Sequence, residues 1–159
     1  MSQNGTGHTV EIRTVDGKTS RHFVGDLALH EGHAASFTLE REKHKHPNHD
    51  VLMLTAATLL GAGVDTALVA GLPVAYYRSQ KEKLKHHLEN LHAVVTLDGK
   101  NPVRISFGEV IIYPQGAGAL LTVDDLPDSG LVTLIDVGHK TTNYVNYVPL
   151  NFFHFFFTG

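Results

Sequence analysis

LVTLIDVGHKTTNYV, residues Leu131–Val145, is the most informative stretch of the sequence. Leu131–Ile135 is an apolar run typical of a buried strand, and Thr141–Val148 has a second β-like pattern. The tight polar turn Asp136-Val137-Gly138 lies between them. We therefore predict a strand, a turn and a second strand, with a carboxylate at the end of the first strand.

The residue types in this turn suit a nucleotide. The carboxylate of Asp136 can orient a hydrated Mg²⁺ ion, and Gly138 lets main-chain amides approach phosphate oxygens. Thr141 and Thr142 add hydroxyl donors. Asp-x-Gly also occurs in ordinary hairpin turns, so the residues alone leave a purely structural turn open.

Two further hairpins are predicted from Asp-Gly dipeptides, which supply the positive φ that tight turns need. His8–Arg13 and Ser20–Val24 flank Asp16-Gly17. His92–Leu97 and Pro102–Tyr113 flank Asp98-Gly99. The chain therefore contains antiparallel strand pairs on both sides of its middle segment.

The middle segment predicts a helix, a strand and a second helix, and a short helix is expected further along the chain. We expect a helix over Asn48–Leu60, with Asn48 as its N-cap, Gly61 as its stop and burial almost all round. Thr66–Ala70 predicts a strand covered on both faces. An amphipathic helix follows over Val74–Glu89, and a short helix is expected to start in Gly116–Leu121.

Four segments of the chain resemble one family. They are FVGDLA, TALVAGLPVAYY, YPQGAGAL and, above all, LIDVGHKTTNYV. In this order they resemble the actin-like ATPases, most closely the plasmid-segregation, ParM-like branch together with bacterial and archaeal actin homologues. The resemblance extends from about Val10 to Val148. It implies an α/β fold of the ribonuclease-H-like type, a mixed sheet with flanking helices.

The resemblance also implies roles for individual residues. Asp136 would face the Mg²⁺ ion of ATP or GTP through water, and Gln115 would orient the attacking water. Gly138 and His139 would offer main-chain amides to the phosphates, with Thr141 and Thr142 beside them. The implied chemistry is nucleotide hydrolysis by positioning and charge stabilisation. The implied partners are further copies in a filament and a DNA-bound adaptor.

We expect the chain to be incomplete relative to that family. A first phosphate loop is expected upstream of the first hairpin, and an adenosine-binding segment after Val148. Residues 1–122 would then be most of the first actin-like domain, and residues 123–159 the opening hairpin of the second with an aromatic tail. A site with one of two phosphate loops does not close around a nucleotide, so we expect this chain to be inactive alone.

Composition narrows the remaining function classes. The chain has 159 residues, with 13 Lys and Arg against 16 Asp and Glu, and no cysteine. It lacks the basic excess that direct nucleic-acid binding needs, and no Gly-x-x-x-x-Gly-Lys-Ser/Thr motif of a P-loop occurs. No apolar stretch is long enough for a membrane span, and the missing cysteines fit a reducing compartment, so we expect a cytoplasmic protein.

Two other functions remain open at this level. The terminal NFFHFFFTG is rich in phenylalanine and can serve as a contact surface, so the chain can be a non-enzymatic assembly module of the same fold. His44, His46 and His49 lie close enough in sequence to gather on a divalent metal, although His-rich loops also bind metal adventitiously.

Overall fold

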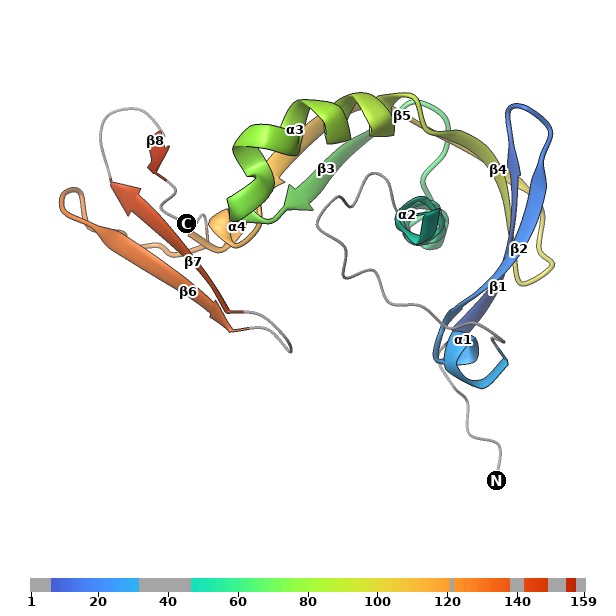
Figure 1. The fold of residues 1–159 in the computed structure, drawn as a ribbon, viewed down its shortest axis with the longest axis horizontal. Helices are drawn as coiled ribbons and strands as arrows, with labels where there is room; N and C mark the ends of the chain where they lie inside the picture. Colours follow the sequence, from blue (N-terminus) through green and yellow to red (C-terminus); the bar gives the residue numbers. More distant parts are fainter. Residues whose placement is uncertain (1–6, 32–46, 121, 138–141, 149–153, 157–159) are drawn as a thin grey trace. The chain divides into compact units, whose positions relative to one another are not determined.

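The computed structural model describes residues 7–31, 47–120, 122–137, 142–148 and 154–156 (Figure 1). Their elements, in chain order, are β1 (Gly7–Thr14), β2 (Thr19–Gly25), α1 (Asp26–Glu31), α2 (Pro47–Leu59), β3 (Thr66–Leu72), α3 (Val74–Glu89), β4 (His92–Leu97), β5 (Val103–Pro114), α4 (Ala117–Leu120), β6 (Val132–Val137), β7 (Thr142–Val148) and β8 (His154–Phe156). The chain divides into two compact units. The first is Met1–Leu68 with Lys83–Val110, and the second is Val69–Glu82 with Ile111–Gly159.

The strands form a five-stranded sheet in the order β2-β1-β4-β5-β3 and a three-stranded sheet in the order β6-β7-β8. Three neighbouring pairs of the larger sheet, β1-β2, β1-β4 and β4-β5, are antiparallel. The main-chain hydrogen bonds from Ser106 N to Gly63 O (3.2 Å) and from Gln115 N to Leu72 O (2.8 Å) join matching ends of β5 and β3. These two strands therefore run parallel, and the expectation of a mixed sheet with flanking helices is confirmed.

Both predicted Asp-Gly hairpins are present. Gly17 has φ +83° in the turn between β1 and β2. In the turn between β4 and β5, Asp98 and Gly99 have φ 51° and 69°, the pair of positive values that defines a type I′ turn. Asp98 also accepts hydrogen bonds from the His8 ring (2.8 Å) and from Thr9 N (2.9 Å). These bonds hold the pKa of Asp98 below its usual value and tie the turn to β1.

Helix α2 differs from its prediction at its start and in its burial. It begins at Pro47, whose fixed φ suits the first helical position, so Asn48 lies inside the helix and is not its N-cap. Its end is as predicted: Gly61 has φ +77°, and the bonds Gly61 N to Thr58 O and Ala62 N to Ala57 O form a Schellman-type stop. Leu54 is fully buried, but Leu52 is 45% exposed, so the expected all-round burial was wrong.

The core of the first unit lies between α2, the end of α3 and one face of the larger sheet. The inward positions alternate along β1, β4 and β5, as expected for antiparallel strands with one covered face. The buried side chains here are Val10, Ile12, Leu54, Leu84, Leu88, Val95, Ile105 and Phe107. Leu84 and Leu88 are four residues apart on α3, which confirms the predicted amphipathic helix over Val74–Glu89.

A side-chain hydrogen bond joins α2 to α3 within the first unit. The His87 ring lies 2.7 Å from Asp50 Oδ1, and His49 Nδ1 lies 3.5 Å from the same oxygen. Burial alone would raise the pKa of Asp50, but the hydrogen bond from His87 and the closeness of both histidine rings outweigh burial and lower that pKa. A carboxylate with a lowered pKa stabilises the folded state while it is ionised.

Asp50→Asn is expected to lower the free energy of unfolding at pH 7 by about 1–2 kcal/mol, because it replaces a charge-assisted hydrogen bond. The native pKa of Asp50 lies below the unfolded value of about 3.9. Its stabilisation is therefore fully present above that value and is lost as the pH falls through the native pKa. Urea denaturation at pH 7, 5 and 3.5 measures this, with exposed Glu109→Gln as control. A difference that grows on acidification would contradict the prediction.

The second unit contains the predicted β6-β7 hairpin. The register pairs Val132 with Tyr147 and Val137 with Thr142, and β8 adds to β7. The buried character expected for Leu131–Ile135 was wrong, since Ile135 is 65% exposed and Leu131 is also exposed. The strand Thr66–Leu72 likewise has one exposed face, because Val69 is exposed, so coverage of both faces was wrong. Among the described residues, no helix is long and apolar enough to cross a membrane.

Candidate functional site

Gln115 lies where β3 and β5 end together, within the second unit. Its main-chain N–H donates to Leu72 O at 2.8 Å, which fixes its backbone beside the Gly71-Leu72-Pro73 turn. Its side chain is half-buried and lies over Gly71, where an added Cβ would be 3.1 Å from Gln115 Cγ and 3.8 Å from Nε2. A larger residue at position 71 would displace this side chain. Sequence reasoning singled out both segments but did not predict that they meet.

Gly116 lets the β6-β7 hairpin approach Gln115. It has φ +84°, a conformation that L side chains rarely adopt. A Cβ at this position would lie 3.0 Å from Leu134 Cδ2 on β6 and 3.5 Å from Val145 Cγ2 on β7. Val145 is fully buried, so this contact anchors the hairpin. The end of β5 and the hairpin therefore pack together at a position that favours glycine for both its backbone and its size.

Asp136 lies two residues beyond Leu134 on β6. Side chains two apart on a strand point to the same face, about 7 Å apart along it. Asp136 is therefore on the hairpin face that approaches Gly116, next to Gln115 in sequence. Its side chain is exposed, and no described residue bonds to its carboxylate. The structure thus places Asp136 and Gln115 in one unit, on segments that meet at Gly116.

The rest of the predicted phosphate loop is only partly described. Gly138, His139 and Thr141 lie outside the described residues, and Thr142 is placed only as the first residue of β7, opposite Val137. The hairpin on both sides of this loop is described, so its two ends are fixed in register. The roles of these four residues, Gly138, His139, Thr141 and Thr142, toward a nucleotide stay predictions.

The histidine cluster is not assembled in the described part of the chain. His44 and His46 lie outside the described residues, and His49 is turned to Asp50. Among the described residues, no group of at least three His, Cys, Asp or Glu side chains can hold a metal ion. A single carboxylate at Asp136 nevertheless fits Mg²⁺ bound with a nucleotide, because Mg²⁺ keeps several waters and uses one or two carboxylates with substrate phosphates.

The sequence matches the family described as actin like proteins, N terminal domain, over residues 1–118. This chain belongs to the actin-like proteins. Its fold agrees with those of the ParM proteins. One is a pCBH ParM non-polymerisable quadruple mutant, with TM-score 0.74 and 28% identity over 88% of this chain and 45% of that chain. No curated protein matches the sequence significantly.

Two other actin-like structures extend the comparison. A 15-stranded ParM filament from Clostridium botulinum matches with TM-score 0.73 and 29% identity, over 89% of this chain and 44% of that chain. The archaeal actin homolog Ta0583, solved in complex with ADP, matches with TM-score 0.58 and 23% identity, over 89% and 47% of the two chains. This actin-like chain thus spans less than half the length of each of these three structures. The predicted family and fold are confirmed.

Proposed function

We propose that this chain is part of an actin-like protein that binds ATP or GTP with Mg²⁺ and assembles into filaments. The observation that carries the proposal is the meeting of Gln115 and the Asp136 strand at Gly116. The two segments that carry the carboxylate and the amide side chain meet within one unit, in a chain that belongs to the actin-like proteins. The ADP in one neighbour and the filament form of another support it.

Each residue of the proposed site has a distinct physical role. Asp136 would hold the water shell of a Mg²⁺ ion bound with the nucleotide, and that ion would supply positive charge to the phosphates. Gln115 offers a carbonyl oxygen and an amide to position the attacking water, with Gly71 beneath it. The amides of Gly138 and His139 and the hydroxyls of Thr141 and Thr142 donate to phosphate oxygens.

The wider biological role follows as part of the same proposal. A nucleotide-dependent filament serves plasmid segregation when a DNA-bound adaptor links it to its cargo, and such a protein works in the cytoplasm. Residues 1–122 and 123–159 are then parts of the two domains between which the nucleotide lies. The comparisons do not favour the alternative of an assembly module without nucleotide, because a structural neighbour contains ADP.

Nucleotide binding by the complete protein tests the proposal. A fluorescent ATP analogue is expected to bind with micromolar or tighter affinity in Mg²⁺ and at least tenfold more weakly in EDTA, because Asp136 would hold the water shell of the metal and the metal would offset the charge of the phosphates. The 159-residue chain is expected to bind much more weakly, since it spans less than half the length of the matched ParM structures and closure of two domains excludes water from such a site. Equal binding in Mg²⁺ and EDTA, or none by the complete protein, would contradict the proposal.

A further inference from the structure

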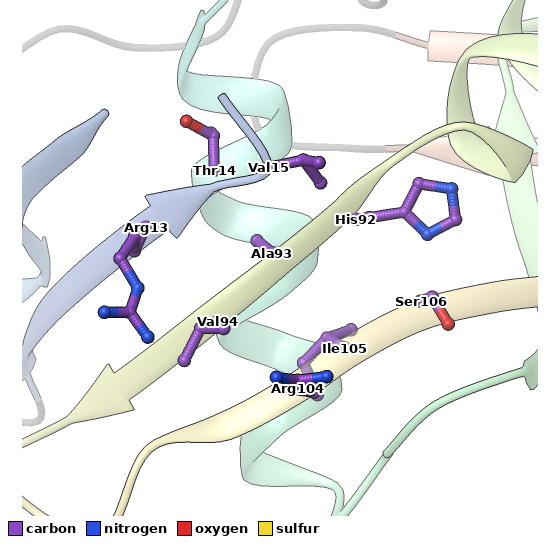
Figure 2. A pocket seen from close by; sticks show the side chains of 9 residues that line it. All are labelled: Arg13, Thr14, Val15, His92, Ala93, Val94, Arg104, Ile105 and Ser106. Carbon is purple, nitrogen blue, oxygen red and sulfur yellow. The ribbon is translucent and has the colours of Figure 1, made fainter. Parts of the chain in front are cut away.

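We propose that a pocket between Arg13 and Arg104, on the solvent face of the larger sheet, binds the acidic segment Asp125–Asp128 of a second copy of this chain. The pocket has a volume of about 520 Å³, within the size range of ligand pockets. Its lining residues are Arg13, Thr14, Val15, His92, Ala93, Val94, Arg104, Ile105 and Ser106, all in the first unit (Figure 2). This contact rests on the proposed function, because it supplies the interface for the self-association proposed there.

The strand register places the two arginines on one face. Arg13 on β1 pairs with Val94 on β4, and Val94 pairs with Arg104 on β5. Residues directly opposite in adjacent strands point to the same side, so the three form one row across the sheet, with an aliphatic side chain between two guanidinium groups (Figure 2). Two strand spacings of about 4.8 Å separate the arginine backbones by roughly 10 Å.

These arginines differ from their neighbours in having no acidic partner among the described residues. Arg21 on the next strand donates to Glu11 at 2.8 Å. The nearby Asp16 accepts a hydrogen bond from the Thr14 hydroxyl, and its Oδ2 lies 3.0 Å from Lys18 Nζ. These contacts lower the pKa of Asp16 to about 2. Arg13 and Arg104 are both exposed, and no described carboxylate pairs with either. A pocket with two unpaired guanidinium groups favours an anionic ligand.

The segment between α4 and β6 has the matching chemistry. It reads TVDDLPDSG over residues 122–130, and Asp125 and Asp128 are exposed and bond to no described residue. The segment is not extended, since residues 124–125 lie in a turn and residues 128–130 in a bend. A chain of three residues spans at most about 10 Å, so the two carboxylates can lie as far apart as the two arginine backbones. Leu126 and Pro127, between the two carboxylates, supply the apolar atoms that suit Val94. Both charge and spacing therefore fit two Asp–Arg pairs.

The pocket and the acidic segment belong to different units of the chain. A contact between different surfaces of two copies is heterologous, and repeated contacts of this kind extend into an open chain unless a rotation closes them into a ring. Because every copy carries both the arginine pocket and the acidic segment, repeated contacts between copies account for filament growth. Because the pairs are exposed to solvent, the association is expected to weaken as salt rises.

A labelled peptide of residues 122–130 tests the pocket by fluorescence anisotropy with the 159-residue chain at low ionic strength. Arg13→Glu with Arg104→Glu is expected to weaken binding roughly tenfold or more, since two attractions become repulsions. Arg78→Glu with Lys83→Glu on α3 makes the same change in net charge and is expected to leave binding unchanged. Equal loss in both variants, or no loss in the first, would overturn the proposal.

Light scattering on the chain itself tests the partner. Asp125→Asn with Asp128→Asn lies outside the sheet and is expected to abolish concentration-dependent association without unfolding the chain. Mixing Arg13→Glu/Arg104→Glu chains with Asp125→Lys/Asp128→Lys chains is expected to restore it. Peptide binding by a chain that stays monomeric at all concentrations would overturn the assignment to a second copy. These measurements use no nucleotide, so their failure is separate from failure of the nucleotide proposal.

Discussion

Asp136→Ala is expected to reduce ATP hydrolysis by the complete protein about a thousandfold. Asp136 is the acidic side chain at the end of β6, on the face that approaches Gly116. In the proposed site it orients the water shell of the nucleotide's Mg²⁺, and misplacing that charge removes stabilisation of the phosphates as their charge redistributes. Phosphate release at saturating ATP and Mg²⁺ measures the effect, with exposed Glu82→Ala in the same unit as control.

The same variant separates function from folding. The Asp136 side chain is exposed and bonds to no described residue, so its removal is expected to change the free energy of unfolding by less than about 0.5 kcal/mol. Loss of hydrolysis with unchanged urea denaturation therefore supports a role toward the ligand. If the Asp136→Ala variant hydrolyses ATP at the original rate, Asp136 is not part of the site, and the segment Asp136-Val137-Gly138 has only a structural role.

Features set by local chemistry were predictable from the sequence. Asp98-Gly99 forms a type I′ turn because both residues tolerate positive φ, and Gly61 ends α2 for the same reason. Helix α3 agrees with its prediction at both ends, since its apolar positions recur with helical spacing and Pro73 precedes it. The start of α2 was predicted one residue too late. Asn48 suits an N-cap and Pro47 suits the first helical position, and the helix begins at Pro47.

Burial and long-range contacts were less predictable. Val69 and Ile135 belong to apolar runs, but a run records only hydrophobicity and does not show whether an element covers each face. The contact of Gln115 with Gly71 joins segments far apart in sequence, and no periodicity encodes it. A signal was nonetheless present, because a glycine within a strand often marks the close approach of another group. The residues of the candidate site were thus predicted one by one, but their assembly was not.

Gln115→Ala is expected to lower the turnover of ATP about a hundredfold while leaving nucleotide affinity within about twofold. In the proposed site this side chain positions only the attacking water, so it contributes to the transition state and not to ground-state binding. The main-chain bond from Gln115 to Leu72 O is retained in this variant, so the junction of β3 and β5 stays in place.

Gly71→Ala tests the role of the Gln115 side-chain amide in a second way. Its added Cβ would lie 3.1 Å from Gln115 Cγ, so it displaces the amide without removing it. We expect an intermediate loss of turnover, about tenfold, because small misplacements of a positioning group are costly. Single-turnover hydrolysis and equilibrium binding of the same ATP analogue measure the two quantities. If affinity falls as far as turnover in both variants, Gln115 contacts the nucleotide itself, and the water-positioning role is wrong.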